Sequence, residues 1–277
     1  IIIFTGDNFS FKFIESKNPQ LLSSSYVPSY TAGLTFFIAV AATNLFHQGN
    51  WQRVYAAKNY ETLKKSLIIS FVIIVPIVFL MGFIGMVSFS IDSTSRPDLG
   101  FFTLLLKDQT ELLSLIIIVL GLALTISTVD TLVNAISSLF VVDGKATFNF
   151  GKKTDYLKLS KYFIIILSII VFIIASKGFD ILYLFLLADL FCCAFVLTIF
   201  YSFYNKKINE KTAYVSIIIG LIGGFLMFPA PDFSKSLLVG ILFSKELFSP
   251  IVSQSLLFLS FVIATFLPLI VFKAKRF

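Results

Sequence analysis

One cluster of hydroxyl, amide and carboxyl side chains lies inside an otherwise apolar stretch, LALTISTVDTLVNAISS, residues 122–138. Ser127, Thr131, Asn134 and Ser138 follow the spacing i, i+4, i+7, i+11 and so share one face of a helix. Hydroxyl and carboxyl oxygens are hard ligands, which suit an alkali cation that has lost most of its water. The cluster therefore predicts a site for Na⁺. The alternative is that the hydroxyls only bond back to carbonyl groups one turn earlier or to neighbouring helices.

Two acids lie within apolar segments, Asp130 in this cluster and Asp189 further along the chain. A carboxylate at the centre of a bilayer costs about 2.5 to 3.5 kcal/mol, so it normally faces a cavity, an ion or a partner. Asp130, together with Thr131 beside it, is a candidate for an ion-binding or gating role, and a proton carried by Asp130 is the nearest alternative to Na⁺. For both acids, a hydrogen bond from a protonated carboxyl group to another helix is the structural alternative.

A second polar stretch, NLFHQGNWQRVYAAK at residues 44–58, holds the only His and the only Trp of the chain. The apolar run 33–46 before it covers about 21 Å as a helix, short of the roughly 30 Å of a bilayer core. We therefore expect a helix that breaks at the start of this stretch and restarts, as in secondary transporters that bind solute at such breaks. The alternative is that the span ends at His47 and the remainder anchors at the interface. The side chains predicted to contact a small polar solute are Asn44, His47 and Gln48.

The elements that position these residues must be membrane helices. Of the 277 residues, 57% are hydrophobic and 13% are charged, and the mean hydropathy is +0.95, whereas soluble domains are about 25% charged. Apolar runs long enough, or nearly so, to cross a bilayer lie near 33–47, 66–90, 112–140, 162–176, 181–204, 212–230 and 251–272. The sequence thus predicts an all-α integral membrane protein with about seven spans, of which the first and fourth are short.

The basic residues indicate the orientation of these spans. Lys and Arg total 22, of which fifteen fall in alternate loops on one side of the predicted spans and seven on the other. Because Lys and Arg favour the cytoplasmic side, the C-terminus is expected in the cytoplasm. The expected location is a plasma or inner membrane. The net charge of +7 then reflects topology and contact with lipid headgroups, and not nucleic-acid binding.

The remaining reactive side chains do not form a catalytic site. Cys192 and Cys193 are adjacent in an apolar segment, with the spacing of neither a metal site nor a disulfide framework. They are expected to serve as small packing residues, as are Gly220, Gly223 and Gly224 in the sixth segment. The single His is accompanied by no nucleophile or metal cluster, so the sequence does not indicate an enzyme.

Three motifs together resemble the sodium:solute symporter family. They are NLFHQGNWQRVYAAK, ALTISTVDTLVNAISSLFVVDG and LYLFLLADLFCCA, at residues 44–58, 123–144 and 182–194. The resemblance runs from about residue 32 to 205, and the STVDTLVNA segment is its most specific part. The motif HQGNWQR is similar to sequences of the urea-transporter-like branch of the family.

The resemblance implies a LeuT-like fold of two inverted five-helix repeats, each opening with a broken helix. The chain would hold the second repeat and two peripheral helices, whereas the first repeat would be a missing N-terminal part, in keeping with an opening that lacks Met. The implied divisions are 1–31, the end of a preceding helix and an outside loop; 32–205, the repeat; and 206–277, the peripheral pair with the cytoplasmic C-terminus.

The resemblance also implies the ion site and the activity. The family's coupling Na⁺ is held by adjacent hydroxyls that match Ser127 and Thr128, and by a backbone carbonyl that matches Leu124; its other ligands belong to the first repeat. The expected function is sodium-coupled import of a small organic solute by alternating access. Proton-coupled transport and a membrane sensor of symporter-like fold remain the alternatives.

Overall fold

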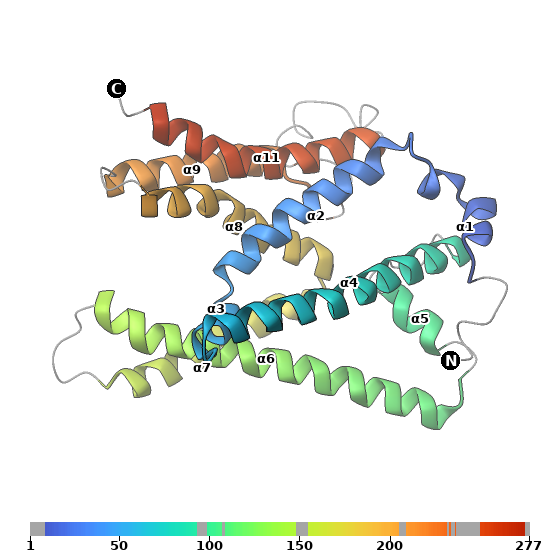
Figure 1. Cartoon of the computed structure of the whole chain (residues 1–277), viewed down its shortest axis with the longest axis horizontal. Coiled ribbons are helices and arrows are strands. Elements are labelled where there is room, and N and C mark those ends of the chain that lie inside the picture. The colour runs from blue at the N-terminus through green and yellow to red at the C-terminus, as the bar shows by residue number, and fades with distance from the viewer. Residues whose placement is uncertain are drawn as a thin grey trace. The chain divides into compact units, whose positions relative to one another are not determined.

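The computed structural model describes residues 9–92, 99–106, 109–147, 155–204, 209–231, 233, 236 and 250–274. These residues are almost entirely helical (Figure 1), and the one β-type pairing among them is an isolated bridge between Pro229 and Ser236. The helices are α1 Phe11–Lys17, α2 Val27–Phe46, α3 Gln48–Ala56, α4 Tyr60–Ile91, α5 Gly100–Leu106, α6 Glu111–Thr147, α7 Tyr156–Ala175, α8 Ile181–Tyr204, α9 Glu210–Met227 and α11 Pro250–Ala274, with the 3₁₀ turn η2 Pro19–Leu22 between α1 and α2.

Seven of these helices are long and apolar enough to cross a membrane, namely α2, α4, α6, α7, α8, α9 and residues Ser253–Phe272 of α11. The prediction of an all-α, multi-pass membrane protein is therefore confirmed. The first and fourth spans are not short, however. Both α2 and α7 have 20 residues, which corresponds to about 30 Å at 1.5 Å per residue. Polar residues that the apolar runs left out, such as Ser29 in α2 and Lys158 in α7, are helical as well.

Three of the spanning helices begin at an Asn or Asp whose side-chain oxygen accepts from a free backbone N–H group. Asn59 caps α4, Asp155 caps α7 and Asn209 caps α9. The first N–H groups of a helix have no partner within the helix, so a polar residue here fixes the point where the chain enters it.

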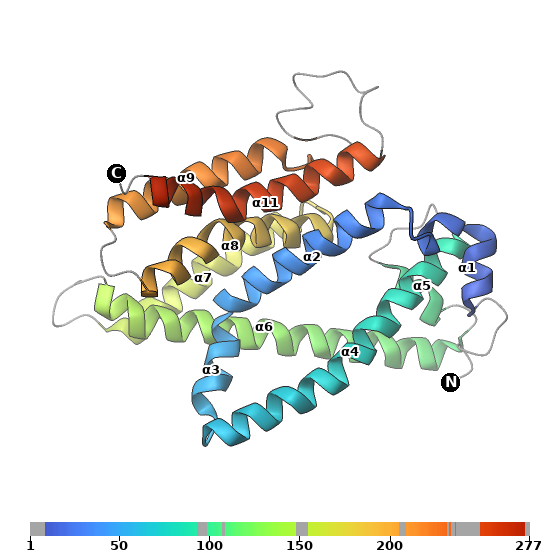
Figure 2. The same cartoon turned by 45° about the horizontal axis from the view of Figure 1, so that its top comes forward.

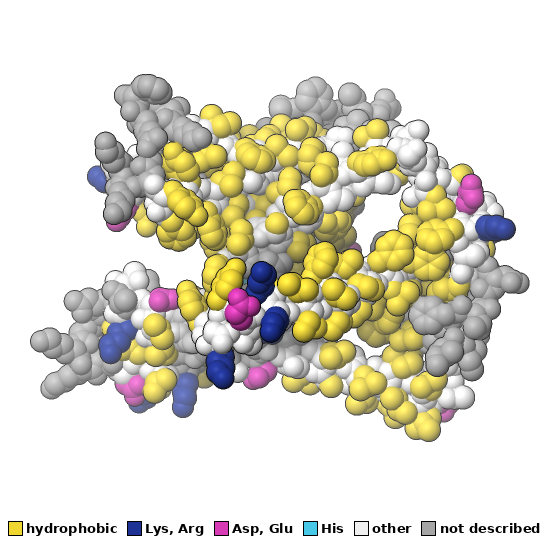
Figure 3. Space-filling model, viewed as in Figure 1, with side chains coloured by type: hydrophobic (Ala, Val, Ile, Leu, Met, Phe, Trp, Pro, Cys, Tyr) yellow, Lys and Arg dark blue, Asp and Glu magenta, His cyan; other side chains and the backbone are white. Residues whose placement is uncertain are grey.

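The chain divides into two compact units, and the first comprises residues 1–22 and 48–178. In it α7 lies along α6, with Phe140 stacked on Phe163 at 4.8 Å between ring centroids. Helix α3 also packs on α6, and α1 and α5 pack on α4. Its helices keep large apolar side chains exposed along most of their length, and hydrophobic side chains cover much of the surface seen in Figure 3. Such faces suit contact with lipid.

The second unit comprises residues 23–47 and 179–277, and it contains α2, α8, α9 and α11. Its core includes Ala39 of α2, Leu190 of α8 and Phe261 of α11, none of which is exposed. Figure 2 shows α9 and α11 side by side. Their close approach depends on glycine, because a Cβ atom at Gly220 would lie 2.2 Å from Cγ of Pro268. The predicted packing role of the glycines in the sixth span is confirmed.

Candidate ion and solute site

The predicted ion residues lie near the middle of α6, the longest helix described. Ser127, Thr128 and Asp130 are exposed, Thr131 is half-buried, and the Leu124 side chain is 71% exposed. None of the residues in the apolar window of α6 is buried, whereas 44% of the window of α8 is. Around Ser127 and Asp130 the polar groups of α6 therefore have little protein cover among the described residues.

The threonine hydroxyls of α6 bond back to carbonyl groups one turn earlier. Thr128 Oγ1 donates to the Leu124 carbonyl oxygen at 3.0 Å, Thr131 Oγ1 donates to that of Ser127 at 3.0 Å, and Thr125 Oγ1 donates to that of Gly121 at 2.9 Å. The alternative that the sequence left open is thus realised for these three side chains. It does not exclude an ion site, because a hydroxyl group has one hydrogen and two lone pairs.

The hydrogen bonds that the Leu124 carbonyl oxygen accepts restrict how it can bind an ion. It accepts from the Thr128 hydroxyl and, as part of the helix, from the Thr128 backbone N–H, which occupies both of its lone pairs. A cation at this oxygen would require the Thr128 hydroxyl to turn away and present a lone pair of its own. Leu124 can therefore be a ligand only when the Thr128 hydroxyl turns away, whereas the Thr128 hydroxyl can offer a lone pair in either orientation.

Ser127 and Asp130 are less engaged than the threonines. The Ser127 hydroxyl has no hydrogen-bond partner among the described residues. Asp130 Oδ2 accepts only a long bond, 3.4 Å, from Nδ2 of Asn134, and within the described ranges no ion pair to Asp130 is formed. Both side chains keep free oxygen lone pairs, which is what a ligand for a hard cation needs.

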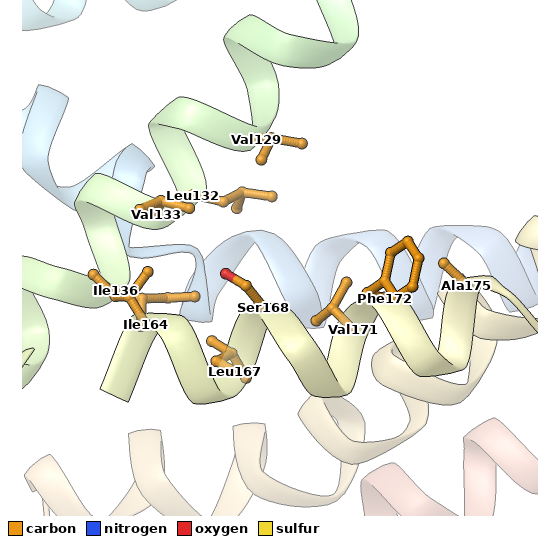
Figure 4. A pocket seen from close by; sticks show the side chains of 10 residues that line it. All are labelled: Val129, Leu132, Val133, Ile136, Ile164, Leu167, Ser168, Val171, Phe172 and Ala175. Atoms are coloured by element: carbon orange, nitrogen blue, oxygen red, sulfur yellow. The ribbon is translucent and has the colours of Figure 1, made fainter. Parts of the chain in front are cut away.

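The opposite face of α6 is apolar and packs against α7. Val129, Leu132, Val133 and Ile136 line a cavity of about 470 Å³ together with α7 residues, and Ser168 is its one polar lining residue (Figure 4). These four positions lie about half a helical turn from the polar face of Ser127, Thr131, Asn134 and Ser138. The polar face therefore points away from α7, and in a membrane it needs protein or water opposite it.

The second predicted site is the interruption after α2. The helix ends at Phe46, His47 has an extended backbone (φ −73°, ψ 102°), and α3 begins at Gln48, so the predicted break is confirmed. The argument that α2 needs α3 to reach across the membrane is wrong, since α2 alone is long enough. The two units of the chain also divide at this point.

The three side chains predicted to contact solute differ in their bonding. Nδ2 of Asn44 donates to the Val40 carbonyl oxygen at 2.8 Å, so part of the hydrogen-bonding capacity of the Asn44 side chain is used within α2. His47 Nδ1 is enclosed and has no hydrogen-bond partner in the described part of the chain. Gln48 is half-buried at the first position of α3. An enclosed polar atom without a partner is costly, which makes His47 the strongest of the three candidates.

Asp189 bonds to another helix, but as an acceptor and not as the predicted donor, and the sequence did not identify its partner. The Thr43 hydroxyl on α2 donates to Asp189 Oδ1 on α8 at 2.5 Å, and Asp189 is only 6% exposed. The acid thus joins two membrane helices across 146 positions of sequence. The signal available in the sequence was the small residues Ala39 and Ala42 close before Thr43, which let another helix approach, and both are buried in the structure.

Comparisons with known proteins give one match. A family model described as "Sodium:solute symporter family" matches residues 12–220, which is most of the chain. No curated protein and no solved structure matches the chain. Among the described residues there is also no group of three or more His, Cys, Asp or Glu side chains arranged to hold a metal ion.

Proposed function

The chain belongs to the sodium:solute symporter family, and from this premise we propose that it takes part in sodium-coupled import of a small organic solute by alternating access. The observation that carries the proposal is the exposed pair of hydroxyls, Ser127 and Thr128, at mid-length in the membrane helix α6. The inward sodium gradient supplies the driving force, and ion binding stabilises the state in which the solute site faces outward.

The proposed ion site uses three oxygen ligands of α6: the hydroxyls of Ser127 and Thr128 and the carbonyl oxygen of Leu124. Its support is chemical, since these are hard, uncharged oxygens in one segment of a membrane helix. Asp130 and Thr131 lie beside the site and act on it indirectly, through water or gating. The remaining ligands come from a preceding five-helix repeat, which would cover the polar face of α6.

The proposed architecture is LeuT-like. In it α2 and α3 form the broken helix, and α4, α6, α7 and α8 complete a five-helix repeat over residues 32–205. Helices α9 and α11, residues 206–277, are peripheral, and residues 1–31 precede the repeat. The C-terminus lies on the cytoplasmic side of a plasma or inner membrane. This orientation is supported by the fifteen Lys and Arg residues on one side of the spans.

The proposed solute site lies at the break after α2, with Asn44, His47 and Gln48 as hydrogen-bonding groups. It is supported by the extended backbone at His47 and by the unpartnered Nδ1 atom there. Residues Ala41 to Asn44, in the last turns of α2, include no aromatic side chain, which disfavours a sugar. A small polar solute such as urea fits the available groups, in line with the urea-transporter-like wording of the motif.

The test is uptake by the full-length protein with labelled urea, amino acids, carboxylates and sugars, in sodium or in choline buffer. We expect uptake of one solute class that requires sodium and that is lost in Ser127→Ala and Thr128→Ala. Thr125→Ala is the matched control, because its hydroxyl makes the same bond to the carbonyl one turn earlier but is not a proposed ligand. Uptake that is indifferent to sodium, or that survives both substitutions, would exclude the proposed ion site.

A second candidate function, proton-coupled transport, is favoured by one observation. Asp130 is an exposed acid within a span, held only by the 3.4 Å bond from Asn134. In this case uptake is driven by a proton gradient in choline buffer and is lost in Asp130→Asn. The Ser127→Ala variant then retains its uptake.

A further inference from the structure

One long-range hydrogen bond connects the two segments that the proposed function places at the solute and the ion. Nε2 of Gln52, on α3, donates to Oγ of Ser138, on α6, at 2.7 Å across 86 positions of sequence. Both residues belong to the same compact unit. The bond therefore links the helix that restarts after the break directly to the helix that carries the polar cluster.

The Ser138 hydroxyl makes two hydrogen bonds in this arrangement. Its hydrogen is donated to the Ala135 carbonyl oxygen of the same helix at 2.9 Å, and a lone pair accepts from Gln52. Since a serine hydroxyl has one hydrogen and two lone pairs, both bonds can exist together. The intrahelical bond fixes the side chain in the orientation in which its oxygen meets α3.

Ser138 also ends the polar face of α6. Ser127, Thr131, Asn134 and Ser138 share this face by their spacing, and Ser127 lies about 16 Å from Ser138 along the helix. Helix α3 thus bonds to the same face that presents Ser127, one of the proposed ion ligands. Because a helix turns as a unit about its axis, a bond at one end restricts the direction in which the face at the other end points.

The neighbouring serine makes a different connection. Ser137 Oγ and Ser160 Oγ on α7 lie 2.8 Å apart and share a hydrogen bond, and Ser160 is 1% exposed. Two adjacent serines of α6 therefore face two different helices, α3 for Ser138 and α7 for Ser137. Of the two links, the one to α3 runs to the interrupted helix and not to a continuous span.

We propose that Gln52 is a positioning residue for ion binding, which couples α3 to the orientation of the Ser127 and Thr128 hydroxyls through Ser138. The inference rests on the proposed sodium site. When α3 is displaced, the bond to Ser138 breaks, α6 keeps only its contacts with α7 to fix its rotation, and sodium affinity falls. The coupling between sodium binding and the position of α3 is reciprocal, since a ligand that fixes α6 also favours the position of α3 that makes the bond.

The test is binding of radioactive sodium to the purified full-length protein without solute. A single neutral hydrogen bond is worth about 1 kcal/mol, so Gln52→Ala and Ser138→Ala are each expected to raise the half-saturating sodium concentration about five-fold. The double variant is expected to be no weaker than either single variant. Ser138→Thr retains the hydroxyl and restores the affinity.

Ser137→Ala provides the matched control, because Ser137 bonds to α7 and not to α3. Its effect, whatever its size, is expected to add to that of Gln52→Ala. Unchanged affinity in Gln52→Ala, or additive effects of Gln52→Ala and Ser138→Ala, overturns the inference.

Failure of the proposed function gives a different result. If Ser127→Ala and Thr128→Ala abolish binding and Gln52→Ala does not weaken it, only the positioning role is wrong. If the wild type binds no sodium, or if all variants bind it equally, both the ion site and the positioning role are refuted.

Discussion

The hydrogen bond between Thr43 and Asp189 is predicted to hold α2 on α8. Replacing Thr43 by Val keeps the shape of the side chain but leaves a carboxyl group that is only 6% exposed without the donor that meets it at 2.5 Å. A buried polar group that loses its partner destabilises a protein by about 1 to 3 kcal/mol. We expect Thr43→Val to lower the free energy of unfolding by that amount. The measurements are the SDS fraction at which the protein unfolds in mixed micelles and its unfolding temperature in detergent, both of which should fall.

The size of the effect depends on the partner that remains. Asp189→Asn keeps an oxygen that accepts from Thr43, so it is expected to be milder than Thr43→Val. When both polar groups are replaced, as in Thr43→Val with Asp189→Leu, no unsatisfied group is left, and most of the lost stability is expected to return. A double-mutant cycle over these variants measures the coupling free energy between the two side chains.

Thr35→Val is the matched control for this prediction. Thr35 is fully buried on the same helix, but its hydroxyl donates at 2.7 Å to the Thr31 carbonyl oxygen of α2 itself, so its loss leaves no group on α8 unsatisfied. The reasoning is refuted if Thr43→Val is no more destabilising than Thr35→Val. It is refuted as well if adding Asp189→Leu to Thr43→Val brings a further loss of stability.

Three further predictions concern packing, a helix cap and the break. Gly220→Ala places a methyl group 2.2 Å from Cγ of Pro268, so it is expected to lower stability by about 1 to 3 kcal/mol. The control is Gly82→Ala, which has no atom within 4 Å of the added Cβ and lowers neither stability nor yield. Equal melting midpoints for the two variants would contradict the packing role of Gly220. Asp155→Ala removes the side chain that accepts from two N–H groups at the start of α7 and is expected to lower the unfolding free energy by about 1 kcal/mol, with Asp155→Asn as the variant that retains the cap. His47→Ala is expected to raise the half-saturating solute concentration at least several-fold while sodium binding without solute is unchanged; an unchanged half-saturating solute concentration would place His47 outside the proposed solute site.

The interruption of the helix at His47 was predicted from the sequence, but the length of the helix before it was not. Its place was predicted from a polar stretch after an apolar run, and the structure puts the extended residue within it. The length of the preceding helix was not predicted, because the apolar run begins several residues after the helix does. Residues such as Ser29 and Tyr30 are helical all the same, since a membrane helix continues until its backbone groups can bond to water or to a cap.

The polar face of α6 gives a similar comparison. The shared face of Ser127, Thr131, Asn134 and Ser138 follows from spacing alone, because one helix fixes their relative directions. Which of the hydroxyls bond within the helix, as Thr128 and Thr131 do, and which keep free lone pairs, as Ser127 does, required coordinates. A hydroxyl rotates about its own bond at little cost, and spacing does not determine that rotation.

The sequence by itself determined the class of the protein, the number of its spans and the face on which the polar residues of α6 lie. These features depend on the transfer of each residue into lipid and on helical periodicity, both of which are local. Only the tertiary structure decided that Thr43 meets Asp189, that Gln52 meets Ser138 and that Gly220 meets Pro268. Each of these contacts joins residues 48 or more positions apart in the chain, and it forms because two helices pack at a particular distance and rotation, which no single segment encodes.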